Sequence, residues 1–170
     1  MRLALISLAL CTLLAGCASD ATSGSEPAPG SCHARGTGAL SLPDARCTPG
    51  AIDPSVTQAN VQSTICRSGY TATVRPPESV TEPEKGASIA AYGDAGSLHD
   101  YEYDHLVPLE LGGARNGPRN LWPEPGASPN VKDTLEGRLR ELVCAGTLSL
   151  GSAQLQIASD WIAAYHRLVR

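Results

Sequence analysis

The segment from Tyr101 to Asn120 reads YEYDHLVPLELGGARNGPRN, and residues 121–125 continue it as LWPEP. Residues 101–107 have the pattern of a strand, in which neighbouring side chains point to opposite faces. His105 and Asp104 are therefore expected on opposite faces of one strand. Two titratable groups at the end of a strand make this segment the first candidate for a functional site.

The chain is expected to reverse direction after this strand. Pro108 cannot donate a ladder hydrogen bond, and Gly112 and Gly113 permit a tight reversal. Residues 120–123 then return as a second short strand, and a helix is expected from about Ser128. The predicted order is strand, loop, strand, helix.

Two helices are predicted at the end of the chain. In the first, apolar residues recur at helical spacing between residues 131 and 143, and Ser128 and Pro129 provide a plausible cap and first position. In the second, one apolar face extends from Ala153 to Leu168. A stripe of this kind predicts packing into the core rather than a binding groove.

The part of the chain before the hairpin is rich in turn signals. Residues 70–74 (YTATV) favour a strand, and residues 60–66 could form a short helix. Residues 81–96 have a mixed pattern that predicts no single element. Together with the hairpin and the two helices, these features indicate an α+β domain.

The first 16 residues have the features of a secretory signal. A positive charge at Arg2 precedes an apolar run from Leu3 to Leu14, which is too short for a stable membrane span. The run ends in LAGC, which resembles a bacterial lipoprotein signal whose cysteine, here Cys17, becomes the lipidated first residue. An ordinary signal peptide cut nearby is the alternative.

A flexible tether and one folded domain are predicted after the signal. Residues 17–31 are small, polar and rich in Ser, Gly and Pro, and residues 32–170 are long enough for one domain. Removal of the signal with Arg2 leaves 12 basic and 17 acidic side chains, a formal net charge of −5. Such a chain lacks the general attraction to phosphate backbones that many nucleic-acid-binding proteins have, but it is compatible with a local basic site.

Cysteine usage also indicates an exported protein. An even number of cysteines outside the signal and the lipidation position implies two disulfides, for which three connectivities are possible. A zinc site is the weaker interpretation because the sequence has no Cys-x-x-Cys pair. The four cysteines are Cys32, Cys47, Cys66 and Cys144.

Residues 104–113 read DHLVPLELGG, and Asn120, LWPEP and a helix containing KD and E follow. This series resembles the HNH endonucleases, a family of ββα-metal nucleases. Residues 47–77 resemble the N-terminal part of HNH-type proteins that bacteria export. The two resemblances cover residues 32–165. They imply a ββα-metal core with short strands, two C-terminal helices and disulfides, and hydrolysis of phosphodiester bonds in DNA, or RNA too, with low sequence specificity.

The resemblance also assigns roles to residues. Phosphodiester hydrolysis needs a deprotonated water and a cation that holds the developing negative charge. By the resemblance, His105 is the general base, Asn120 holds the hairpin and orients that base, and Asp104 binds a divalent cation. Asn130 takes the last metal position, where a His names the family, although it could instead cap the helix three residues before Asp133. Oxygen ligands suit Mg²⁺ or Mn²⁺.

Three basic residues beside the motif could contact phosphates, although isolated charges of this kind are more often solvated. They are Arg115, Arg119 and Lys132.

The four cysteines fit this arrangement. Cys32 and Cys47 flank a loop-rich segment, and we predict that they pair. We predict a second disulfide between Cys66 and Cys144, which would tie the N-terminal segment to the end of the catalytic helix.

The sequence thus predicts a monomeric, metal-dependent endonuclease that acts on nucleic acid outside the cytoplasm, at the cell surface or in the periplasm. A lipid on Cys17 would anchor it to a membrane. The alternative hypothesis is a non-catalytic surface lipoprotein, with a binding or structural role, that retains the HNH-like fold. The net charge favours this alternative, and the intact pair Asp104 and His105 opposes it.

Overall fold

The structure is a computed structural model that describes residues 24–126 and 128–170. The signal predicted for residues 1–16 and the lipidation position Cys17 lie outside the described residues. Within the predicted tether, residues 24–31 contain no helix or strand, and the amide of Gly30 donates a hydrogen bond of 2.8 Å to the carbonyl of Ala90. None of the helices in the described part is both long and apolar enough to span a membrane.

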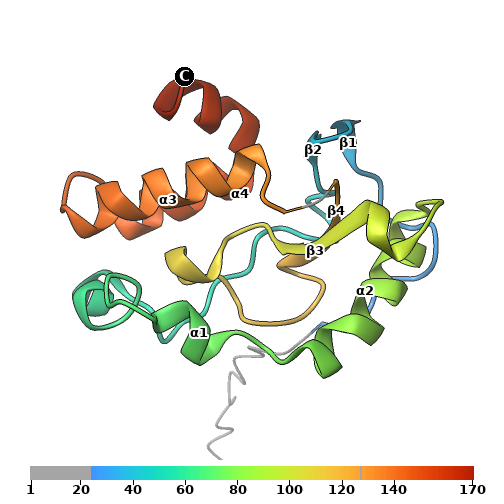
Figure 1. The fold of residues 1–170 in the computed structure, drawn as a ribbon, viewed down its shortest axis with the longest axis horizontal. Coiled ribbons are helices and arrows are strands. Elements are labelled where there is room, and N and C mark those ends of the chain that lie inside the picture. Colours follow the sequence, from blue (N-terminus) through green and yellow to red (C-terminus); the bar gives the residue numbers. More distant parts are fainter. Residues whose placement is uncertain (1–23, 127) are drawn as a thin grey trace, which may run out of the picture.

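The fold is α+β, with two small antiparallel sheets and four α-helices in the part of the chain that the structure describes (Figure 1). Three short 3-10 helices, labelled η, lie between them. In chain order the elements are β1 Arg35–Thr37, β2 Leu40–Leu42, η1 Gln58–Ser63, α1 Tyr70–Val74, α2 Glu78–Tyr92, η2 Leu98–Asp100, β3 Tyr101–His105, η3 Leu109–Leu111, β4 Leu121–Pro125, α3 Val131–Cys144 and α4 Leu150–Leu168.

The predicted order of strand, loop, strand and helix is confirmed for residues 101–144. β3 and β4 are antiparallel, with Tyr101 opposite Pro125 and His105 opposite Leu121. β3 ends at His105, two residues earlier than expected, because the backbone then turns into the loop that contains η3. α3 begins at Val131 rather than at Pro129.

The strand predicted for residues 70–74 was wrong, because this segment forms the helix α1. Its β-branched residues favour strands only where a neighbouring strand can pair with them. Here Gly69 adopts a left-handed conformation with φ of 76° and starts the helical turn. The hydroxyl of Thr73 also donates a 2.6 Å hydrogen bond to the carbonyl of Tyr70, three residues earlier, which adds a local contact to this short helix.

The segment that predicted no single element forms most of α2. Only the C-terminal part of this helix is buried, through Ser88, Ile89, Ala91 and Tyr92, so its sequence lacks a continuous apolar stripe. Pro76 and Pro77 precede the helix, and Gly93 ends it in a left-handed conformation with φ of 65°.

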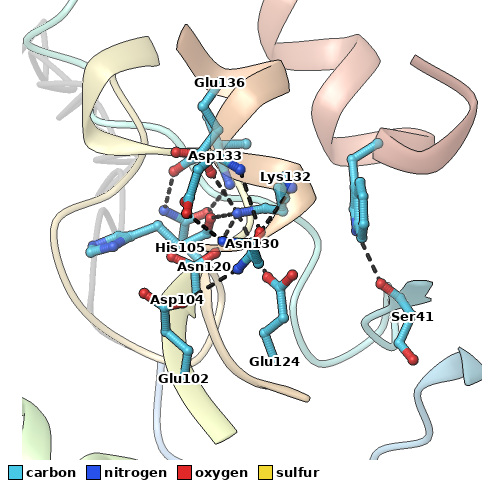
Figure 2. A network of polar contacts seen from close by, with 12 residues as sticks. Ser41, Glu102, Asp104, His105, Asn120, Glu124, Asn130, Lys132, Asp133 and Glu136 are labelled. Carbon is cyan, nitrogen blue, oxygen red and sulfur yellow. Dashed lines mark hydrogen bonds and ion pairs between the residues drawn. The ribbon is translucent and has the colours of Figure 1, made fainter. Parts of the chain in front are cut away.

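Both C-terminal helices were predicted correctly, and they contribute eight of the 19 buried residues of the hydrophobic core. α3 packs against α4 and against η3, whereas α2 contacts β4. The indole of Trp161 on α4 is completely buried and donates a 3.0 Å hydrogen bond to the carbonyl of Ser41 on β2 (Figure 2). In Figure 1, α3 and α4 lie on one side of the hairpin and α1 and α2 on the other. The hairpin therefore lies between two pairs of helices.

Both predicted disulfides are present. Cys32 pairs with Cys47 over a separation of 15 residues, and Cys66 pairs with Cys144 over 78 residues. The second bond joins the segment before α1 to the last residue of α3.

Removal of the Cys66–Cys144 bond by paired serine substitution is expected to lower the free energy of unfolding by about 4 kcal/mol, because the longer loop restricts the unfolded chain more. Removal of the Cys32–Cys47 bond is the matched control, with an expected loss of about 3 kcal/mol. Urea denaturation of both variants measures the difference. An unchanged midpoint in reductant, with all four thiols shown to have reacted, would contradict the prediction.

Candidate active site

His105 is the last residue of β3, and only 5% of it is exposed. Its Nε2 lies 3.0 Å from the carbonyl oxygen of Arg115. A carbonyl can only accept a hydrogen bond, so Nε2 carries a proton, and in the neutral ring Nδ1 holds the free lone pair. In Figure 2 the imidazole points away from the side chains of Asp104 and Lys132.

The surroundings of His105 favour its neutral form. Burial lowers the pKa of the imidazole, and the positive charges of Arg75 and Lys132 lower it further. The bond to Arg115 and the charge of Asp104 act in the opposite direction, but the net direction is downward. His105 can therefore accept a proton at Nδ1 at neutral pH.

A cleft of about 180 Å³ adjoins His105. It lies between the hairpin and the chain that joins α1 to α2. A second cleft of about 490 Å³ shares part of this wall, including Arg75, and adds Lys85 and His99. The smaller cleft is lined by Arg75, Pro76, Glu78, Thr81, Tyr103, His105 and Leu121.

Asn120 fixes the loop that holds His105. It is completely buried, and its Oδ1 accepts a 2.9 Å hydrogen bond from the amide of Val107. Its Nδ2 donates 2.9 Å bonds to the carbonyls of Val107 and Ala114. Because Arg115 directly follows Ala114, Asn120 also sets the position of the carbonyl that orients the imidazole.

Two glycines make this loop possible. Gly112 has φ of 71°, in the left-handed region that favours glycine. A Cβ at Gly113 would lie only 1.7 Å from the carbonyl oxygen of Val107 and 2.8 Å from Nδ2 of Asn120. Another residue at Gly113 would therefore displace the hydrogen bonds of Asn120.

Asp104 lies on the opposite face of β3 from His105, as predicted, and faces α3. Its carboxylate forms a short ion pair with Nζ of Lys132, which is completely buried. The same Nζ donates a 2.9 Å hydrogen bond to the carbonyl of His105. It also lies 2.6 Å from Oε1 of Glu136 and 3.7 Å from Oε2 of Glu124 (Figure 2).

The three carboxyl groups around the ammonium of Lys132 differ in their pKa values. Burial raises the pKa of Glu124 to about 9 and that of Glu136 to about 8. Burial alone would also raise the pKa of Asp104, but the charge and hydrogen bond of Lys132 lower it instead. Burial opposes the charge of Lys132, yet the three carboxylates raise its pKa well above the ordinary value. At neutral pH the ionised pair is therefore Asp104 and Lys132.

Replacement of Glu124 by glutamine is expected to stabilise the protein increasingly as the pH rises from 5 to 8. Folded Glu124 retains its proton in this range, whereas unfolded Glu124 loses it near its ordinary pKa of 4.5, so wild-type stability falls with rising pH through this group. Glutamine has no proton to lose. We expect the difference between variant and wild type to grow by on the order of 2 kcal/mol in urea denaturation. Glu141→Gln, on the exposed face of α3, is the control, and equal pH profiles for both variants would contradict the assignment.

The two groups that the resemblance assigns to a metal do not fit a divalent ion in this arrangement. The carboxylate of Asp104 already binds the ammonium of Lys132. Of the two interpretations of Asn130, the structure shows the helix cap, because its Oδ1 accepts a 2.8 Å hydrogen bond from the amide of Lys132 and one of 3.4 Å from that of Asp133. Across residues 24–126 and 128–170, no group of three His, Cys, Asp or Glu side chains could hold a metal ion.

None of the three predicted phosphate contacts lines the cleft beside His105. Arg115 forms a 2.7 Å ion pair with Asp53. Arg119 lines a separate cleft with Ile52 and other apolar residues. Lys132 was expected at the surface, but the three carboxylates around it hold it in the interior.

Sequence reasoning missed Arg75, which lines both clefts near His105. The available signal was weak, since it is a single basic residue before two prolines. It also missed Glu124 and Glu136. The spacing of Lys132 and Glu136, four residues apart on a helix, was the signal that could have suggested this ion pair.

Comparison of the chain with family models, with curated proteins and with solved structures finds no match. The functional argument therefore depends on the residues of the site and on their geometry. The strongest elements of that geometry are the orientation of His105 and the cleft that it faces.

Proposed function

We propose that the protein is a nuclease that hydrolyses phosphodiester bonds of nucleic acid, with DNA as the main substrate and His105 as the general base. The observation that carries this proposal is the state of His105: a neutral imidazole, held through Nε2, at the wall of a cleft that also contains a guanidinium. The resemblance of the hairpin to HNH endonucleases, with Asp104, His105 and Asn120 in their expected places along the chain, supports the same chemistry.

Two residues of the cleft and one behind it have defined tasks in this proposal. His105 accepts a proton from water at Nδ1, and the resulting hydroxide attacks phosphorus in line with the leaving oxygen. The exposed guanidinium of Arg75 binds the phosphate and offsets the negative charge that develops on it. Asn120 holds the loop that orients His105.

The setting of this activity follows from the charge and the cysteines. Two disulfides are consistent with an extracellular location. We propose that the protein acts there as a monomer, anchored through a lipid on Cys17. The acidic chain has little general attraction to nucleic acid, so binding should depend on few phosphate contacts and only weakly on salt, with low sequence specificity.

A non-catalytic surface lipoprotein is the second candidate. The observation in its favour is that Asp104 and Asn130 are both engaged in contacts that stabilise the fold. In this case the hairpin would keep its architecture without turnover. Cleavage assays separate the two candidates.

The proposed function predicts different effects for two arginines. Arg75→Ala is expected to lower kcat/KM for plasmid and single-stranded DNA by roughly 10- to 100-fold, the effect of one charge-assisted hydrogen bond to phosphate. Arg119→Ala removes one positive charge from the separate cleft that contains Ile52, and it should have little effect on kcat/KM. The assay uses the oxidised full chain with Mg²⁺, with Mn²⁺ and with chelator.

Two results would oppose this proposal. Equal losses in both variants would mean that general electrostatic attraction, and not the cleft beside His105, binds the substrate. Absence of cleavage by the folded wild-type protein on DNA and RNA, under all these conditions, would favour the non-catalytic lipoprotein.

A further inference from the structure

Three carboxylates from three elements converge on one ammonium group in this protein. Asp104 is on β3, Glu124 on β4 and Glu136 on α3, and each lies within 4.0 Å of Nζ of Lys132. A convergence of this kind in the interior is the arrangement expected around a cation. In this structure the cation is a side chain.

The site holds two carboxyl groups beyond the one that its ammonium pairs with, and the raised pKa values of Glu124 and Glu136 keep both protonated at neutral pH. Glu124 is 2% exposed, and neither of its carboxylate oxygens has a hydrogen-bond partner among the described residues. Burial of a carboxyl group without a hydrogen-bond partner costs free energy of folding. This cost indicates that Glu124 has a role at the position of the cation. Because no group of three His, Cys, Asp or Glu side chains among the described residues is arranged to hold a metal ion, a divalent cation can bind these carboxyl groups only if they close in after the ammonium is removed.

The position of Lys132 is itself fixed by the start of α3. The side chain of Asn130 caps this helix and accepts a 2.8 Å hydrogen bond from the amide of Lys132. Nζ then reaches both Asp104 and the carbonyl of His105. The ammonium thus connects the first turn of α3 to the end of the strand that carries the proposed base.

We propose that the ammonium group of Lys132 is the resident cation of this hairpin and occupies the place that the resemblance to HNH endonucleases gives to a divalent ion. Lys132 is a positioning residue that acts through Asp104 and the backbone of His105, and the site works without a divalent ion. Only the activity part of this inference depends on the proposed nuclease function. The cation-binding part stands on the geometry of the carboxylates.

The central test measures Mn²⁺ binding to the full chain by electron paramagnetic resonance. Wild type is expected to bind Mn²⁺ only weakly, whereas Lys132→Met should bind it roughly 100-fold more tightly, reaching the micromolar range of carboxylate sites. Adding Glu124→Gln to this variant should remove the gain. Arg138→Met, which removes one positive charge from the exposed face of the same helix, is the matched control and should resemble wild type. Failure of the folded Lys132→Met protein to gain affinity would overturn the proposal.

A second comparison avoids any variant of Lys132, in case Lys132→Met does not fold. Wild type and Asp104→Asn should show the same weak Mn²⁺ binding, and wild-type cleavage of DNA should persist in chelator. Submillimolar binding in wild type that disappears in Asp104→Asn would overturn the proposal, as would loss of cleavage in chelator. If no cleavage is seen under any condition, the nuclease function fails, but the binding comparison still decides the role of Lys132.

Discussion

Replacement of His105 by alanine is expected to lower the rate of phosphodiester cleavage by about 10²- to 10⁴-fold, the contribution of a well-placed general base. In the proposed mechanism Nδ1 accepts the proton, because Nε2 donates to the carbonyl of Arg115. His105→Gln is the matched variant. Its side-chain amide can still donate to Arg115, but it has no basic nitrogen, so it should lose as much activity as alanine while retaining more stability.

The pH dependence of kcat/KM gives an independent test of this role. Burial and the charge of Arg75 lower the pKa of His105, so the imidazole stays neutral, and active, as the pH falls below the ordinary histidine value of 6.5. The acidic limb of the profile should therefore have its midpoint below 6.5, and Arg75→Ala should move it upward. A midpoint at or above 6.5 in wild type, or full activity of His105→Gln, would contradict the assignment.

The parts of the fold that could be predicted are those with a strong local pattern. Alternation of side chains placed Asp104 and His105 on opposite faces of β3, and apolar spacing located α3 and α4. Residues 70–74 were mispredicted because their preference for strands depends on a pairing partner, which this segment lacks in the described structure. α2 could not be predicted because only one end of it is buried.

Much of the candidate site depends on tertiary contacts that leave no local signal. Arg75 approaches His105 from a segment 30 residues away in sequence, and no spacing rule connects them. Lys132 resembled a surface charge because buried lysines are rare unless they are paired. Its three carboxylate partners come from separate elements, and only Glu136 is at a helical spacing from it. The sequence therefore indicated the hairpin and the place of His105 at the end of its first strand, but not the buried Lys132 between the hairpin and α3.

The single residue of the hairpin with the largest expected effect on stability is Asn120. Replacement by alanine leaves the amide of Val107 and the carbonyls of Val107 and Ala114 without partners in a buried loop. Each unsatisfied group costs about 1–3 kcal/mol, and some relaxation of the loop will reduce the sum, so we expect a loss of about 3–6 kcal/mol in the free energy of unfolding. Urea denaturation measures it.

Asn116→Ala is the control for Asn120, because it lies in the same loop and loses one 2.8 Å hydrogen bond to Glu84. Its expected loss is about 1 kcal/mol. The comparison also tests the link between the loop and the base: since Asn120 positions the carbonyl that holds Nε2 of His105, the folded fraction of Asn120→Ala should have a lower kcat and a shifted acidic limb, whereas Asn116→Ala should have neither. Equal stability losses in the two variants, or an unchanged pH profile in folded Asn120→Ala, would mean that Asn120 only packs the loop and that the orientation of His105 has another origin.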